Sequence, residues 1–159
     1  MPADIISVAY LTLIFIRCHY LLTGNHIDAL KFLVKRGAKI CTTTHGLTPL
    51  MEAADKGKQD MVHYLTKMAS TLGLDLNHRD RDGANVLFYC VSGGHQGLLE
   101  FLLNAGCDVT EDNHGRNLLM QAALSGHMTM LHYLIGHALQ LGLDLHHTDL
   151  NGRNALFYW

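Results

Sequence analysis

The strongest constraint on this chain is a unit that occurs several times. In residues 83–109, a glycine is followed by a short apolar stretch, a glycine pair, a second apolar stretch and a stop at Gly106. Asn85 can cap a first helix over residues 85–92, because its side-chain oxygen can accept a free backbone N–H. Gly106 can adopt the left-handed conformation that ends a second helix over residues 96–104. Helices this short are unstable alone in water, so the unit must pack against copies of itself.

The copies begin at Gly46, Gly115 and Gly152, and their spacing alternates. The intervals are 37, 32 and 37 residues, so that both two-unit intervals are 69 residues long. Duplication of a pair of units explains this pattern more simply than two parallel insertions. The extra residues fall in second helices, which we expect to be about one turn longer over residues 61–72 and 128–141 and to project on one edge.

One copy carries a motif that identifies a family. Thr48-Pro49-Leu50-Met51-Glu52-Ala53 resembles the ankyrin-repeat signature Thr-Pro-Leu-His-x-Ala, with Met51 in place of the histidine. The resemblance covers residues 23–159 and implies an all-α solenoid of stacked helix-turn-helix units with β-hairpin loops, called fingers below. It also implies about four repeats, of which the first and last are incomplete, and a non-catalytic role in protein binding.

The repeat boundaries follow from the glycines that open each unit. Residues 1–22 form an atypical apolar segment, and residues 23–159 form the ankyrin-repeat region. That region divides into a partial repeat to residue 45, repeats 46–82, 83–114 and 115–151, and a partial repeat over residues 152–159.

The apolar run over residues 5–16 has three interpretations. Twelve residues are too few to cross a bilayer, which needs about 20. A signal peptide is not favoured, because Asp4 replaces the usual positive charge and no typical cleavage site follows. We expect the run to supply the first helix of the first repeat. It would expose large apolar side chains at an end where a cap should be polar, which suggests a missing upstream repeat or a start site that replaces one.

A second helix of that first repeat should follow a turn at residues 23–26. Its apolar residues should form one buried stripe: Ile27, Leu30, Phe32, Leu33 and Val34.

Trp159 is unusual for its place in the repeat. It occupies the position of Ala53, Cys90 and Ala122 in the other copies, where a small side chain should pack between helices. A tryptophan would overfill that space, unless its ring lies over an open end of the solenoid. Because no second helix follows it, we expect the chain to be a fragment, truncated product or splice variant of a longer array.

Composition narrows the partners and the compartment. The 12 Lys and Arg nearly balance the 14 Asp and Glu, so charge gives no case for nucleic acid or a lipid surface. The four cysteines (Cys18, Cys41, Cys90, Cys107) are scattered singly and are interpreted as reduced thiols. These features favour the cytoplasm or nucleus over secretion or membrane anchoring.

Catalysis and metal binding are not supported by the sequence. His146 and His147 are adjacent, and His127, His132 and His137 are each five residues apart, which does not suit ligands on one helix face. Ser92 and Ser125 lie near histidines, but both are in repeat turns, and copies of one turn should not both be catalytic. We expect no metal, cofactor or small-molecule substrate. The ankyrin resemblance instead implies a structural role for the turn histidines His26, His95 and His127.

The polar loops that precede each repeat-opening glycine are the candidate binding sites, because loops often carry function. The residues expected to bind a protein partner lie in these loops: Arg79, Arg81, Glu111, Asn113, His114, His147 and Leu150. Arg79 and Arg81 are the best anchors, since arginine is enriched at binding hot spots. Two alternatives remain open: an intramolecular spacer or regulatory segment of a larger multidomain protein such as an enzyme, and a short product without a stable fold.

Overall fold

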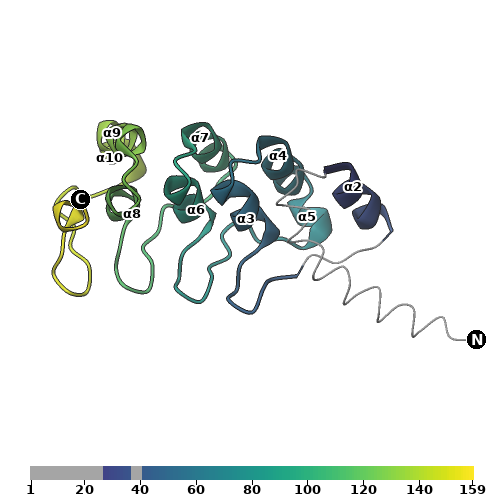
Figure 1. Ribbon diagram of the computed structural model, residues 1–159, viewed down its shortest axis with the longest axis horizontal. Coiled ribbons are helices and arrows are strands. Elements are labelled where there is room, and N and C mark those ends of the chain that lie inside the picture. Colours follow the sequence, from purple (N-terminus) through teal and green to yellow (C-terminus); the bar gives the residue numbers. More distant parts are fainter. Residues whose placement is uncertain (1–26, 37–40) are drawn as a thin grey trace, which may run out of the picture.

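The computed structural model describes residues 27–36 and 41–159, and it shows a row of stacked helix pairs (Figure 1). The inner helices are α3 (Pro49–Asp55), α6 (Val86–Ser92) and α8 (Leu118–Leu124). The outer helices are α4 (Gln59–Lys67), α7 (Gln96–Asn104) and α9 (Met128–Gly136). Helix α2 (Ile27–Lys35) lies at one end, and the 3-10 helix η1 (Ala155–Phe157) lies at the other. The expected all-α solenoid of stacked helix-turn-helix units is confirmed, since consecutive inner helices pack side by side as equivalent rungs.

Each inner helix begins at a residue that caps it. Thr48 accepts a hydrogen bond from the Met51 N–H at 3.2 Å, and Pro49 fills the first helical turn, where a missing N–H costs nothing. Asn85 caps α6, and Asn117 caps α8 in the same way. These caps fix where each helix starts and therefore where the preceding finger turns away from the stack.

The core runs the length of the stack between the inner and outer helices. Its members include Ala53, Leu87, Cys90, Leu99 and Leu134, each fully buried. Small residues on the inner helices let neighbouring pairs approach closely, and leucines from the outer helices fill the space above them. Because every pair contributes to its neighbours' core, no pair buries its apolar face alone.

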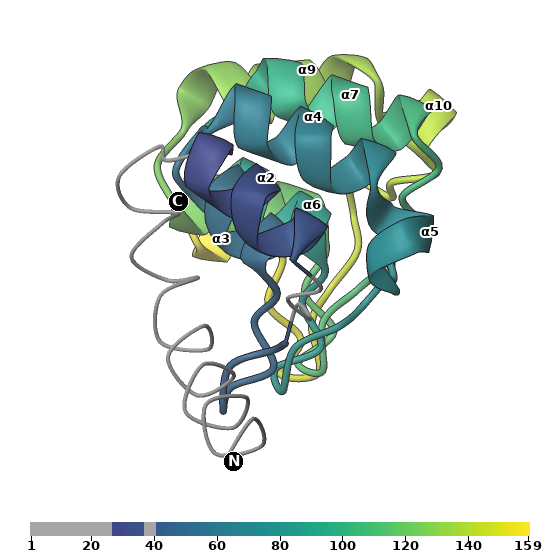
Figure 2. The same cartoon turned by 90° about the vertical axis from the view of Figure 1, so that its right-hand side faces the viewer.

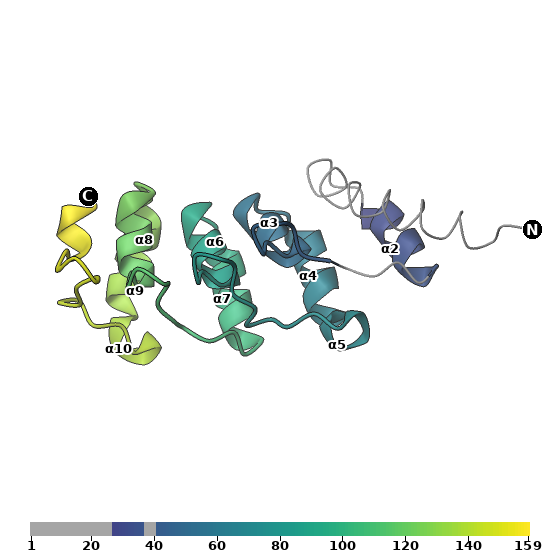
Figure 3. The same ribbon diagram turned by 90° about the horizontal axis from the view of Figure 1, so that it is seen from below.

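The extra residues of the longer repeats form separate helices, so the expected continuous extension is wrong. The outer helices α4 and α9 each have nine residues, the same length as α7. Met68 and His137 interrupt them, and the short helices α5 (Ala69–Leu72) and α10 (Ala138–Leu141) follow. Both project on the same edge of the stack, as expected (Figure 3).

Two further outcomes concern the N-terminal part. Phe32, expected in the buried stripe of α2, is 57% exposed, and the guanidinium of Arg36 lies 4.9 Å from its ring centroid. Within the described residues no helix pair packs on the far side of α2, and Leu30 is buried on the side that faces the stack. The expectations for residues 1–26, including His26 and the apolar run, lie outside the described residues.

Seen along the stack, the inner helices, the outer helices and the fingers each superpose (Figure 2). The finger turns span residues 43–46, 80–83, 112–115 and 149–152, and each is closed by an N–H of the fourth residue donating to the carbonyl of the first. Residues 27–36 and 41–159 contain no assigned strand, so each finger is a tight turn on extended arms.

Candidate interaction surface

Each of the last three fingers is held by an aspartate at its first turn position. The Asp80 Oδ1 accepts hydrogen bonds from the N–H groups of Asp82 and Ala84, both at 2.9 Å. Asp112 and Asp149 make the corresponding pairs of bonds. An aspartate suits this position because its side chain can bond the backbone two residues on. The turn conformation of these three fingers is therefore fixed by bonds within each finger.

Neighbouring fingers are joined by a ladder of backbone hydrogen bonds. The Arg81 N–H donates to the His45 carbonyl at 3.1 Å, the Asn113 N–H to the Asp82 carbonyl at 2.8 Å, and the Leu150 N–H to the His114 carbonyl at 3.0 Å. One bond of this kind joins each consecutive pair from residue 43 onward. The four turns thus form one continuous row below the helices (Figure 1).

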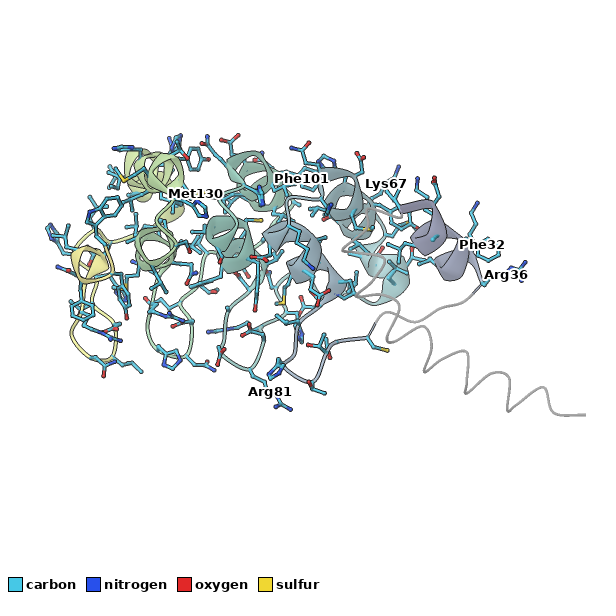
Figure 4. All side chains as sticks on the ribbon, in the orientation of Figure 1. Phe32, Arg36, Lys67, Arg81, Phe101 and Met130 are labelled. Atoms are coloured by element: carbon cyan, nitrogen blue, oxygen red, sulfur yellow. The ribbon has the colours of Figure 1, made fainter. Side chains whose placement is uncertain are left out.

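Four of the seven expected binding residues lie at the tips of this row. Arg81 extends away from its finger (Figure 4), and the side chain of Leu150 is 78% exposed. Asn113 and His114 are also exposed. The Asn113 Nδ2 donates to the Arg81 carbonyl at 2.9 Å, so that side chain is already engaged in joining two fingers.

The other three lie together around a separate polar hollow of about 440 Å³, between the arms of the third and fourth fingers. Arg79 donates from Nε to the Gly83 carbonyl at 2.7 Å and from Nη2 to the Glu111 carbonyl. The His147 Nε2 donates to the Gly115 carbonyl at 2.8 Å and lies 3.4 Å from a Glu111 carboxylate oxygen. The structure therefore divides the predicted residues into a tip group and a hollow group.

The role of Arg79 follows from comparing the repeats. His78 donates to the Gly46 carbonyl at 2.9 Å, just as His147 does to that of Gly115. In the repeat between them the equivalent residue, five positions before the next repeat-opening glycine, is Thr110. Its buried hydroxyl has no hydrogen-bond partner. Arg79 supplies the missing donor to Gly83, so its side chain supports the second and third fingers.

The turn histidines bond the preceding repeat. The His95 Nε2 donates to the Asp55 carbonyl at 3.0 Å, and the His127 Nε2 donates to the Ser92 carbonyl at 2.7 Å. Both acceptors lie at the ends of inner helices, where carbonyls lack partners within the helix.

Residues on the inner helices and immediately before them were not among those predicted from the sequence. A hollow of about 140 Å³ lies between the second finger and the inner helices, and Tyr89, Arg116 and Gln121 line it. The Tyr89 hydroxyl donates to Asp80 Oδ2 at 2.5 Å, and burial with this bond raises the pKa of Tyr89. Arg116 pairs with Asp112 at 2.6 Å. Arg116 lies one residue after a repeat-opening glycine, and Tyr89 and Gln121 lie six residues after theirs. These recurring offsets could have indicated the three residues from the sequence.

The carboxyl of Asp149 has a perturbed pKa. Burial alone would raise the pKa of its carboxyl, but hydrogen bonds donated by Arg153 and Tyr158 outweigh burial and hold the pKa below its ordinary value. The carboxylate is thus kept charged while fixing the fourth finger.

No group of three or more His, Cys, Asp and Glu side chains that could hold a metal occurs in residues 27–36 and 41–159. Within the part of the chain that the structure describes, no helix is long and apolar enough to cross a membrane. Cys90 and Cys107 are buried and form no disulfide.

Stacked helix pairs with a row of joined turns define a repeat solenoid, a class of proteins in which each repeat contacts only its neighbours and the stack presents one extended surface. The family model described as ankyrin repeats in three copies matches residues 17–80 and 66–149. The chain belongs to the ankyrin-repeat family, as the motif at Thr48 predicted.

Two curated relatives are much longer than this chain. A putative ankyrin repeat protein of Acanthamoeba polyphaga mimivirus is 36% identical over 69 residues, which cover 43% of this chain and 10% of the relative. Alpha-latrocrustotoxin-Lt1a of Latrodectus tredecimguttatus is 29% identical over 86 residues, covering 54% of this chain and 6% of the toxin. The similarity thus spans a tenth or less of each relative.

Proposed function

We propose that this chain is a non-catalytic protein–protein interaction module, which binds its partner through the finger tips and the inner helices α3, α6 and α8. Ankyrin repeats generally mediate protein–protein interaction, and the family is typically non-catalytic. The proposed contacts include both groups defined above, the tips and the hollow, together with Tyr89, Arg116 and Gln121.

The backbone ladder between the fingers is the observation that carries this proposal. A surface whose loops are already ordered loses less conformational entropy when a partner binds. Here the bonds from Arg81, Asn113 and Leu150 fix the loops, while the Arg81 and Leu150 side chains stay exposed to meet a partner. The surface is therefore preorganised by the fold.

Arg81 and Leu150 are the proposed anchors. Arginine is enriched among hot-spot residues, and an isolated leucine that is 78% exposed provides apolar area to bury. Arg79 is less suitable for testing, because replacing it also removes the donor to the Gly83 carbonyl and disturbs the finger itself.

Quantitative pull-down with the chain as bait tests the proposal. The double variant Arg81→Glu, Leu150→Asp should lose specific partners, with an affinity loss of about 30-fold if the pair contributes a hot-spot energy of about 2 kcal/mol. Lys67→Glu on α4 is the matched charge-reversal control on another face (Figure 4). With circular dichroism showing that all variants are folded, equal partner recovery by wild type and the double variant would remove the finger tips from the binding surface.

A second candidate is an intramolecular spacer or regulatory segment within a larger multidomain protein, such as an enzyme. The much greater length of both relatives favours it. The reading frame that surrounds the coding sequence discriminates the two candidates: a domain encoded in frame that binds this chain in isolation supports the second.

The proposed location is the cytoplasm or nucleus. The buried thiols of Cys90 and Cys107, which form no disulfide, suit a reducing compartment. Fluorescence microscopy of the tagged chain tests this, and signal confined to the secretory pathway would contradict it.

A further inference from the structure

The third and fourth fingers each pair their first aspartate with an arginine. In the third, the Arg116 Nε donates to Asp112 Oδ2 at 2.7 Å, and its Nη2 lies 2.6 Å from the same oxygen. In the fourth, Arg153 makes the same two contacts with Asp149, at 2.8 and 2.7 Å. Each arginine directly follows its repeat-opening glycine, and each aspartate is only 5% exposed. A guanidinium therefore covers the carboxylate in both fingers.

The second finger has the aspartate but lacks the arginine. Ala84 occupies the position of the two arginines, whereas Asp80 keeps the position of the aspartates. None of the ion pairs in the part of the chain that the structure describes involves Asp80, and this residue is partly exposed. The first finger has Thr43 and Leu47 at the two positions, so it carries no carboxylate there. Among the four fingers, only the second thus leaves this carboxylate without its guanidinium.

Tyr89 does not take the place of the missing arginine. Its hydroxyl donates to Asp80 Oδ2 at 2.5 Å. The copy 69 residues later, Tyr158, donates to Asp149 Oδ2 at the same distance while Arg153 is bonded to that oxygen as well. The guanidinium carbon of Arg153 also lies 5.1 Å from the Tyr158 ring centroid, within the range of a cation–π contact. A tyrosine at this position therefore leaves room for a guanidinium and offers it a ring.

The hollow of about 140 Å³ beside the second finger lies where that arginine is missing. Its lining includes four residues of the finger and of α6: Asp80, Asp82, Ala84 and Tyr89. The volume is about ten times the roughly 10–15 Å³ that one water requires, so a guanidinium group fits. Asp82 adds a negative charge where the fourth finger has the neutral Asn151. Arg116 also lines the hollow, but its charge is balanced by Asp112. The vacant place is therefore anionic.

We propose that this hollow binds the guanidinium of an arginine from the partner protein. The Nε and one Nη of that arginine donate to Asp80 Oδ2, as in the copies, and the group lies close to the Tyr89 ring. Arginine suits the place better than lysine, because both copies use two nitrogens of one planar group. The inference rests on the function proposed above, since the arginine belongs to the protein that the module binds.

An NMR titration with N-acetyl-arginine methylamide tests the site directly. The backbone amides of Asp82 and Ala84 are the reporters, because both donate to Asp80 Oδ1. Their signals should shift saturably, with half-saturation on the order of 10 mM, the strength of about one charge-assisted hydrogen-bonded pair. The citrulline analogue has nearly the same shape without the charge and should not shift them. The lysine analogue should bind more weakly than the arginine probe.

Ala84→Arg is the variant that closes the site. The introduced side chain should pair with Asp80 as Arg153 does with Asp149, so it should raise the thermal unfolding temperature and abolish the probe-dependent shifts. As bait in the pull-down above, this variant should recover at least about tenfold less partner than the wild type, because one charged hydrogen-bonded pair is lost. Thr71→Arg is the matched control, since it adds the same charge at an exposed position on α5.

The inference and the proposed function fail on different results. No saturable shift of the two amides, or equal shifts with the arginine, lysine and citrulline probes, would overturn the inference. So would equal partner recovery by wild type and Ala84→Arg when Arg81→Glu, Leu150→Asp abolishes recovery, and the interaction module would then stand without this site. Saturable arginine binding at Ala84 with no specific partner in any pull-down would instead remove the proposed function and leave the guanidinium site.

Discussion

The capping asparagines offer a graded test of how the stack is stabilised. Asn85, Asn117 and Asn154 occupy one repeat position, two residues after the repeat-opening glycine, and each accepts a backbone N–H bond of 3.1 Å. They differ in burial and in the second bond that each makes. Replacing each asparagine by alanine therefore removes the same kind of helix cap from three different repeats.

The expected losses can be worked from these contacts. Asn85 is 1% exposed, and its Nδ2 also donates to the Asp108 carbonyl at 2.7 Å. Loss of the cap costs about 1 kcal/mol, and the unpaired groups left behind cost about 1–3 kcal/mol more. We expect Asn85→Ala to lower the free energy of unfolding by about 2–4 kcal/mol.

The other two positions should cost less. The second bond of Asn117, to the Asp144 carbonyl, is long at 3.4 Å, so Asn117→Ala should fall between the extremes. Asn154 is exposed and caps only η1, so Asn154→Ala should cost no more than about 0.5 kcal/mol, the low end of the range for caps.

Urea denaturation followed by circular dichroism measures the series, provided that the slope with urea stays constant. A loss for Asn154→Ala that equals or exceeds the loss for Asn85→Ala would refute the reasoning. Such a result would mean that intrinsic cap strength, rather than the bond to the neighbouring repeat, decides stability.

Three further predictions concern glycine, thiol and carboxylate chemistry. Gly83→Ala should lower the thermal unfolding temperature more than Gly142→Ala does. Both glycines have a positive φ, so both substitutions strain the backbone. An added Cβ at Gly83 would also lie 2.7 Å from a backbone nitrogen of the next finger, whereas nothing lies near Gly142. Burial is the main cause that raises the pKa of Cys90 to about 12. Iodoacetamide should therefore label this thiol only in denatured protein, which peptide mass spectrometry would show. Because the folded state favours the neutral thiol, its contribution to the free energy of unfolding should be lost as the pH rises from about 9 toward about 12. Arg153→Ala should raise the pKa of Asp149, which an NMR titration of the carboxyl would measure. In the wild type, the lowered pKa of Asp149 stabilises the fold above about pH 4. This stabilisation is lost on acidification.

Much of the fold was predictable because its local signals recur. The caps at Asn85 and Asn117, the glycine turns and the leucine spacing each appear several times, so a repeated pattern could be distinguished from coincidence. The interruption of the outer helices at Met68 and His137 was not predictable. Gly136 precedes His137, but neither proline nor glycine lies beside Met68 at the equivalent position. The exposure of Phe32 depends on what lies beyond α2, which local spacing does not reveal.

The candidate site was predictable in its loops but not in its side-chain contacts. Arg79 and Arg81 have the same chemistry and lie two residues apart, yet only Arg79 reaches a backbone carbonyl, which depends on Thr110 in another repeat. The inner-helix contribution of Tyr89 was missed because its bond to Asp80 joins a helix to a finger. Such contacts depend on how the finger folds back, which periodicity alone does not specify.

Site-directed photo-crosslinking tests the central claim most directly. A benzoylphenylalanine side chain introduced at Arg81 or at Leu150 should yield covalent adducts with the same partner protein in cells, because both tips face it. The same group at Lys67, on the outer helix α4, should not yield that adduct. Adducts of one partner from Lys67 alone, or none from either finger tip, would contradict the assignment of the fingers as the binding surface.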